Sequence, residues 1–160
     1  MKPAYRGIAV ALTQCLIVLS VAGKYEFDRV RLPRVWAKAA PVDPNLPVRG
    51  RYVSLRLEVS GQEPGANDYW RCARLSIQNG RLVATPVAPG TALMISRSQN
   101  QTWALTEPVA FFIPEHIPDP SRRAPDEELW VEVSLPKNGP PRPLRLGVKK
   151  NGVLTPLDLP

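Results

Sequence analysis

The sequence has few of the residues that build metal and catalytic centres. Its 160 residues include one histidine, His116, and two cysteines, Cys15 and Cys72. One histidine cannot supply a metal site with two or more histidine ligands. Two cysteines, one of them in an apolar N-terminal stretch, do not make the disulfide framework of a small secreted domain. We therefore expect no metal and no cofactor.

Motifs of known catalytic chemistry are also missing. The chain has no G-x-S-x-G, no H-E-x-x-H, no phosphate loop and no dinucleotide-binding glycine pattern. Cys72 has Arg71 and Arg74 nearby, and such neighbours lower a thiol pKa where the side chains converge. A free cysteine more often packs as a small hydrophobic residue. We predict that the protein is not an enzyme.

The charge is strongly basic but dispersed. The net charge is +7 and the pI is near 9.8, yet no block of five or six like charges occurs, and no RNA-binding aromatic motif or zinc-finger spacing accompanies the arginines. We expect no nucleic-acid partner. A solvated basic surface that tolerates anionic lipid headgroups is the simpler interpretation.

The N-terminus carries the one long apolar run of the sequence. Lys2 and Arg6 precede seventeen uncharged residues, 7–23, and Lys24 ends the run. As a helix this run is about 25 Å long, at the short end of what spans a bilayer. We predict a basic tail at 1–6 and a transmembrane anchor at 7–23. The alternative is a signal peptide cleaved after Ala22.

Orientation in the membrane is left open by the charges. Two basic residues precede the run, whereas five follow within fifteen residues, which favours a cytoplasmic body by the positive-inside rule. The short basic tail, apolar run and polar exit are instead typical of an export signal. We expect a single-pass protein of the inner, cytoplasmic membrane with its β-domain in the periplasm.

The body of the chain alternates with a period of two. Apolar and polar residues alternate over 52–59, as in a half-buried strand. Asn79-Gly80 and Asn151-Gly152 separate strand-like runs, a strong hairpin signal. Nineteen prolines favour short strands over helices. We predict a mainly β protein: one all-β sandwich or partly open barrel of about seven to nine short antiparallel strands over 45–160.

Two segments outside this pattern are predicted to be irregular. Residues 24–44 are expected to form a juxtamembrane connector, in which Pro33 stops any helix that leaves the membrane. Residues 115–128 are polar and interrupted by prolines, and are expected to form the longest irregular loop of the body.

Two aromatic residues fall on the polar faces of their strands. Tyr52 and Trp130 are not needed there for a core, and with Arg51 and Arg56 nearby they suit a protein interface or a membrane-surface contact. The alternative is that a second layer covers this face.

The stretch "PVDPNLPVRGRYVSLRL", residues 41–57, resembles the signature of the GDYXXLXY family. Gly50, Tyr52 and Leu55 match the name, Arg51 stands where the family has Asp, and Leu57 stands where it has the final Tyr. "PVDP" also resembles the family's approach to the motif. Similarity continues through "RCARLSIQNGRLVATPVAPGTAL" and "AFFIPEH", so it covers roughly 39–155.

This resemblance implies a bacterial envelope protein that is anchored by its N-terminus and associated with a multi-pass integral membrane protein. The predicted function is that of a non-catalytic accessory or interaction module. The candidate interaction residues are Asp43, Gly50, Arg51, Tyr52, Leu55, Glu115 and Trp130.

Two further hypotheses stay open. The 41–55 stretch also resembles the active-site approach of signal-peptidase-type Ser/Lys peptidases, with Pro41 in the place of the nucleophilic serine. A degenerate hydrolase on that scaffold would need a nucleophile and a base from elsewhere, Ser54 or Cys72 with Lys149 or Lys150. The other hypothesis is a soluble periplasmic binding protein released after Ala22.

Overall fold

The structure is a computed structural model that describes residues 3–42, 51–61, 70–88, 90, 93–97 and 102–159. The chain divides into two compact units, residues 1–32 and 33–160. The first holds the helix α1 and the second is the β-domain. The predicted class, an N-terminal helix followed by a mainly β domain, is confirmed.

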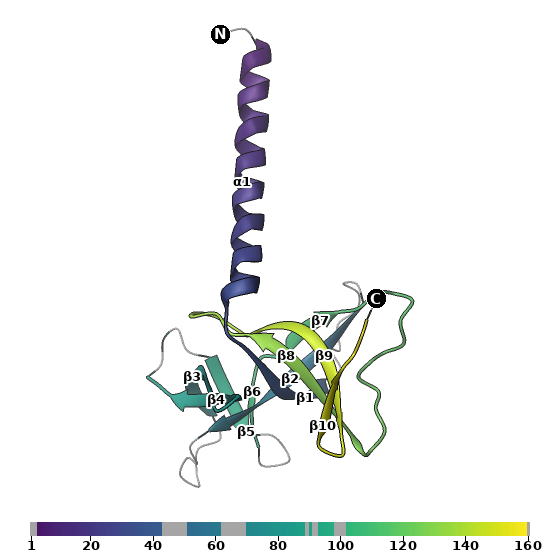
Figure 1. Ribbon diagram of the computed structural model, residues 1–160. Coiled ribbons are helices and arrows are strands. Elements are labelled where there is room, and N and C mark those ends of the chain that lie inside the picture. Colours follow the sequence, from purple (N-terminus) through teal and green to yellow (C-terminus); the bar gives the residue numbers. More distant parts are fainter. Residues whose placement is uncertain are drawn as a thin grey trace. The chain divides into compact units, whose positions relative to one another are not determined.

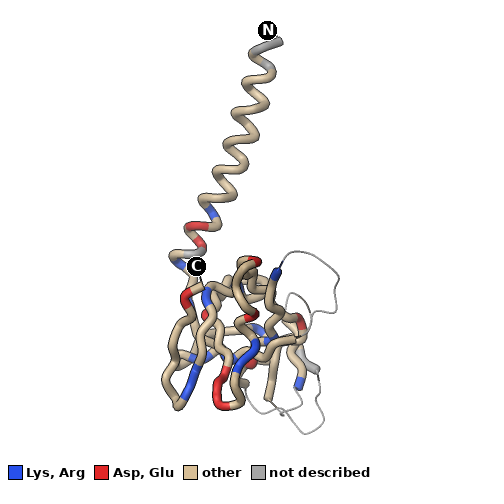
Figure 2. The backbone as a smooth tube through the Cα atoms, turned by 90° about the vertical axis from the view of Figure 1, so that its right-hand side faces the viewer, with Lys and Arg blue, Asp and Glu red and all other residues tan. Residues whose placement is uncertain are grey.

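Helix α1 spans Pro3–Arg31, and its window Gly7–Asp28 is long and apolar enough to cross a membrane. No charge interrupts residues 7–23, which Figure 2 shows as an uncoloured length of the helix. The helix continues beyond Lys24, where the predicted anchor gives way to the predicted connector. Residues 24–31 contain no glycine or proline, so nothing there breaks the helix. Pro33, which disfavours helical backbone in the residue before it, follows the end.

The second half of the expected connector is a strand. β1 spans Arg34–Val42 and lies between two neighbours, β8 on one side and β2 on the other. Val35, Ala37 and Ala39 are buried, while Trp36 and Lys38 lie on the opposite face. The connector predicted over 24–44 is therefore divided between the helix and the sheet, and the two units meet at residues 32 and 33.

Ten strands are present among the described residues, more than the seven to nine expected. Besides β1 they are β2 (Tyr52–Gly61), β3 (Trp70–Gln78), β4 (Arg81–Pro86), β5 (Leu93–Arg97), β6 (Trp103–Leu105), β7 (Val109–Phe112), β8 (Glu127–Ser134), β9 (Arg142–Lys150) and β10 (Val153–Pro156).

Five of these strands form a closed barrel. The order is β2-β4-β3-β5-β6, and β6 closes the ring by pairing with β2. In Figure 1 the strands β3 to β6 gather on one side of the domain. The β2–β4 pair is parallel, with Ser60 opposite Val83. The expected all-antiparallel arrangement is wrong at this one pair, and the partly open barrel is closed.

Strand β2 also belongs to a second, open sheet. This sheet runs β7-β2-β1-β8-β9-β10, and Figure 1 shows β8, β9 and β10 on the side away from β3 to β5. The first half of β2, from Tyr52, pairs with β7 and β1, and the second half, from Glu58, pairs with β6 and β4. One strand therefore joins the barrel to the sheet.

Both predicted hairpins are confirmed. Asn79 and Gly80 have φ of 50° and 71°, and Asn151 and Gly152 have φ of 51° and 83°. Two consecutive positive φ values define the turn that matches the twist of a two-residue hairpin, and Asn-Gly is the pair that adopts them most readily.

The predicted alternation in β2 is also confirmed. Val53, Leu55, Leu57 and Val59 are all buried. They join a core whose most deeply buried members include Val131, Val133 and Leu146 of the neighbouring strands. Fully burying such side chains stabilises the fold by about 1.5–3 kcal/mol each.

Candidate functional site

The predicted interaction residues do not form one site. Asp43 and Gly50 lie outside the described residues. Leu55 is fully buried in the core, so its side chain supports the fold. The remaining four fall on two surfaces: Arg51, Tyr52 and Glu115 come together, and Trp130 lies in another cluster.

We call the first surface the motif corner and define it by Arg51, Tyr52, Phe112 and Glu115. It forms where β2 begins and β7 ends, because Tyr52 is opposite Phe112 in the β2–β7 ladder. The backbone N–H of Ile113 donates to the carbonyl oxygen of Arg51 at 3.0 Å, which extends this pairing by one residue.

Arg51 is held by the loop that follows β7. Its Nη1 donates to the backbone carbonyl of Glu115. The carboxylate of Glu115 is not the acceptor, and its side chain is exposed. Since the resemblance places an Asp at position 51, this contact is one that the family's acidic residue could not make. Two of the predicted interaction residues, Arg51 and Glu115, are therefore in contact, through the main chain of Glu115.

The aromatic pair is the most exposed apolar part of the corner. The ring centroids of Tyr52 and Phe112 are 6.0 Å apart and the rings are tilted by 53°, an edge-to-face type of contact. Tyr52 is half-buried, while Phe112 is 71% exposed. Within the described residues β7 pairs only with β2, so Phe112 lies on an edge strand.

A turn in the predicted loop 115–128 supports the corner. Asp119 accepts hydrogen bonds from the backbone N–H and the hydroxyl of Ser121, at 2.9 and 2.7 Å. Burial raises the pKa of Asp119, but these hydrogen bonds and the charges of Arg122 and Arg51 outweigh it, and the pKa lies below its ordinary value. The loop is irregular as predicted, although its last two residues begin β8.

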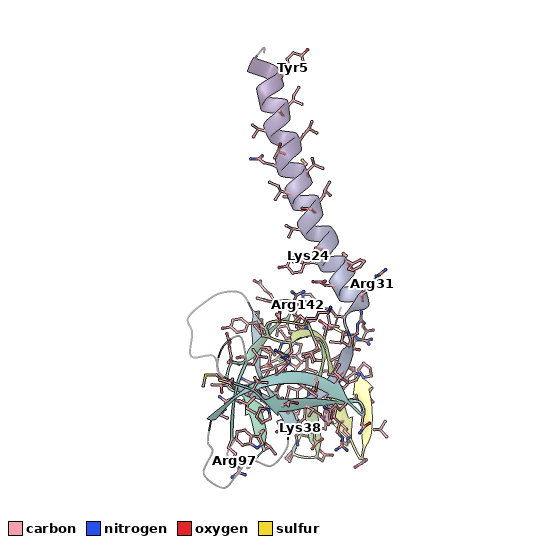
Figure 3. All side chains as sticks on the ribbon, turned by 90° about the vertical axis from the view of Figure 1, so that its left-hand side faces the viewer. Tyr5, Lys24, Arg31, Lys38, Arg97 and Arg142 are labelled. Atoms are coloured by element: carbon pink, nitrogen blue, oxygen red, sulfur yellow. The ribbon has the colours of Figure 1, made fainter. Side chains whose placement is uncertain are left out.

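The second surface, which we call the lysine–tryptophan cluster, is made of Lys38, Glu128, Trp130 and Lys149. Lys38 Nζ lies 2.8 Å from Glu128 Oε1, and Trp130 Nε1 donates to Glu128 Oε2 at 3.1 Å. The ammonium of Lys149 lies 4.7 Å from the centroid of the Trp130 ring. Figure 3 labels Lys38 on the β-domain. Trp130 is half-buried by these contacts, so the covering predicted as the alternative applies to it in part.

The ion pair between Lys38 and Glu128 moves the pKa values of both groups further from neutral pH. The hydrogen bond to Glu128 raises the pKa of Lys38 above its ordinary value. The hydrogen bonds from Lys38 and then from Trp130 lower the pKa of Glu128. Both groups are therefore charged across the whole neutral range.

A groove of about 470 Å³ adjoins this cluster. It lies where β1 and β4 separate along β2, between Trp36 and Lys38 on one side and Arg81 on the other. Trp36 rests on β9, because a Cβ at Gly147 would be 2.8 Å from its Cζ3 atom. The missing side chain at Gly147 therefore leaves the space that the indole occupies.

The nucleophiles named for the hydrolase hypothesis are buried or half-buried, and its lysines contact other side chains. Ser54 is buried in β2 and Cys72 is half-buried in β3. Lys150 is paired with Asp126 at 2.9 Å, which raises its pKa. A lysine that stays protonated is not a general base. No cluster of three potential metal ligands occurs in the described part of the chain.

Sequence reasoning missed Phe112 and the partners of Trp130. Phe111 and Phe112 are adjacent in a short apolar run. Composition alone does not tell which of the two is exposed. Lys38 and Lys149 are ninety-two and nineteen residues from Trp130 in sequence. Only the pairing of β1 with β8 and of β8 with β9 brings them together.

Comparison with known proteins adds no relative. No family model matches the chain, no curated protein matches it, and no solved structure matches it. The likeness to the GDYXXLXY family therefore stays a prediction from sequence.

Proposed function

We propose that the chain is a single-pass protein of the bacterial inner membrane whose periplasmic β-domain binds an integral membrane partner and catalyses no reaction. The observation that carries this proposal is the motif corner. It presents an exposed phenylalanine, a half-buried tyrosine and an oriented arginine on the edge of a sheet.

The corner has the composition of a protein interface. Tyrosine, phenylalanine and arginine are enriched in interfaces, and an arginine or tyrosine often carries much of the binding energy. Tyr52 and Phe112 keep each other in place, so little side-chain freedom is lost on binding. Arg51 donates to a main-chain carbonyl, and its positive charge also acts on the nearby carboxylate of Asp119, whose pKa it helps to lower.

The helix supports the anchoring part of the proposal. Its apolar side chains, from Ile8 to Val21, are about half or more exposed. Such a surface is stable in lipid and costly in water. Figure 3 shows these side chains projecting around α1 between Tyr5 and Lys24.

Binding is favoured over catalysis by the direction of the pKa shifts. Each resolved shift in the described residues lowers the pKa of a carboxyl group or raises the pKa of a basic group. Catalytic acids and bases are instead tuned toward the operating pH. These groups behave as members of structural ion pairs.

A photo-crosslinking comparison tests the proposal. A benzophenone amino acid replaces Phe112 in the full-length chain in its native membrane, and in a second variant it replaces Val153, which is similarly exposed on the far edge strand β10. We expect an adduct with one multi-pass membrane protein from position 112 and none from position 153. Equal adducts from both positions, or adducts with soluble proteins alone, would refute the interface at the corner.

A further inference from the structure

The polar side chains of the apolar helix differ in how their hydrogen bonds are satisfied. Thr13 Oγ1 donates to the carbonyl of Ala9 at 2.9 Å, and Ser20 Oγ donates to the carbonyl of Ile17 at 2.8 Å. Both hydroxyls are thus satisfied by their own helix. Within the part of the chain that the structure describes, the amide of Gln14 makes no hydrogen bond and is exposed.

Gln14 lies near the middle of the uncharged run 7–23. In a bilayer an unpaired amide at that depth cannot be solvated by water and costs free energy until it finds a partner. Polar side chains inside transmembrane helices therefore face other protein groups and hold helices together.

We propose that α1 associates with a second copy of itself through Gln14. All copies insert with the same orientation, so two parallel helices place their Gln14 side chains at the same depth. A primary amide is both a donor and an acceptor, so two of them can exchange hydrogen bonds with each other. The side chain is therefore self-complementary.

Small residues before Gln14 allow two helices to approach closely there, whereas Val10, Ile17 and Val18, its other neighbours at this spacing, are β-branched. Ala11 and Gly7 lie one and two turns before Gln14 on the same side of the helix, and Cys15 lies one turn after Ala11, at the edge of this side. Small residues let helix backbones come near enough for interhelical hydrogen bonds. Thr13, Leu16 and Ser20 lie on a different side by the same spacing, so the satisfied hydroxyls and the unsatisfied amide are separated.

This inference rests on the proposed membrane anchor, and Cys15 provides its test. The full-length chain, with Cys72 replaced by Ser, is oxidised with copper–phenanthroline in native membranes. We expect a disulfide-linked dimer through Cys15. The matched control carries Cys15→Ala and Leu16→Cys, which moves the thiol to the other side at nearly the same depth, and should give little dimer.

Substitutions of Gln14 separate the hydrogen bond from packing. Gln14→Met is expected to weaken dimerisation roughly 3- to 30-fold, the range for loss of one to a few interhelical hydrogen bonds in lipid. Gln14→Asn keeps an amide and should retain most of the dimer, and Thr13→Val removes a satisfied hydroxyl and should change little. Förster transfer between labelled copies in liposomes measures the same constants without oxidation.

Several results would overturn the inference. They are equal cross-linking through Cys15 and through the Leu16→Cys thiol, an unchanged dimer in Gln14→Met, and cross-linking of Cys15 to another protein but not to itself. The mass of the mature chain distinguishes the two proposals. An intact but monomeric chain removes the self-association alone, whereas a chain cut after Ala22 has lost the helix, and both proposals fail.

Discussion

The motif corner and the lysine–tryptophan cluster both combine aromatic rings with basic side chains, but they use them in opposite ways. In the corner, Phe112 is 71% exposed, and Arg51 is bonded to a backbone carbonyl. In the cluster, Glu128 binds both Lys38 and the indole of Trp130, while Lys149 lies over the ring.

The difference indicates which surface is available to a partner. Charges in the cluster are paired within the domain, so a ligand would first have to break those pairs. The corner leaves an aromatic side chain exposed, and its arginine donates to a backbone carbonyl while its charge acts on Asp119. We infer that the corner binds and that the cluster joins β1, β8 and β9. The following substitutions test this difference between the two surfaces. In each case the free energy of unfolding of the detergent-solubilised full-length chain is measured in urea.

The largest loss of stability is expected for a residue of the motif stretch 41–57. Leu55→Ala removes a fully buried side chain from the strand shared by the barrel and the sheet, and should destabilise the domain by about 2–5 kcal/mol. A change below about 1 kcal/mol would mean that this motif residue is not a core residue.

Gly147→Ala should have the next largest effect. The new methyl group would lie 2.8 Å from the Trp36 ring and 3.2 Å from the carbonyl of Thr155, so the indole must move. Overpacking of this kind costs about 1–3 kcal/mol. The double variant Gly147→Ala/Trp36→Leu should recover part of the loss. If it does not, the contact between these residues is not the cause.

Glu128→Gln should destabilise by less than about 1 kcal/mol, because both members of its pair with Lys38 are exposed enough to be screened. The pKa of Glu128 is lowered, so its contribution is present above the ordinary carboxyl range and is lost as pH falls through the lowered value. The pKa of Lys38 is raised, so the contribution persists until pH rises through that raised value. Wild type and variant should thus differ by a constant amount between about pH 5 and 10 and converge in acid. A difference that grows in acid would contradict this ion pair.

The smallest effect on unfolding is expected for Phe112→Ser, within about 0.5 kcal/mol, because the side chain is mostly exposed. The same variant should greatly reduce the yield of partner cross-linked through a nearby position on β7. Loss of stability by more than about 1.5 kcal/mol would instead make Phe112 a structural residue.

Local features of the fold could be predicted because they depend on neighbours in sequence. The Asn-Gly turns at 79–80 and 151–152 and the alternation of β2 are of this kind. β1 was missed because its inward side chains include Ala37 and Ala39, which give little hydrophobic contrast, and because Pro41 falls in the same segment. The parallel β2–β4 pair and the closure by β6 depend on contacts distant in sequence, so no local pattern reveals them.

The candidate interaction residues also differ in how far the sequence alone could place them. Arg51 and Glu115 are both predicted interaction residues, and the structure brings them into contact through the carbonyl of Glu115. Leu55 is a predicted interaction residue, although the alternation of β2 puts it on the same side of the strand as the core residues. The structure shows it buried. Trp130 is another predicted interaction residue, but β8 places it opposite Lys38 on β1, in the other cluster.

The most direct test of the anchored binding module is its membrane topology. A compartment-sensitive reporter is fused to the C-terminus of the full-length chain, and the mass of the mature N-terminus is measured in the same membranes. We expect an intact N-terminus at Met1 or Lys2 and a reporter outside the cytoplasm. A reporter in the cytoplasm, or a new N-terminus at Gly23, would contradict it.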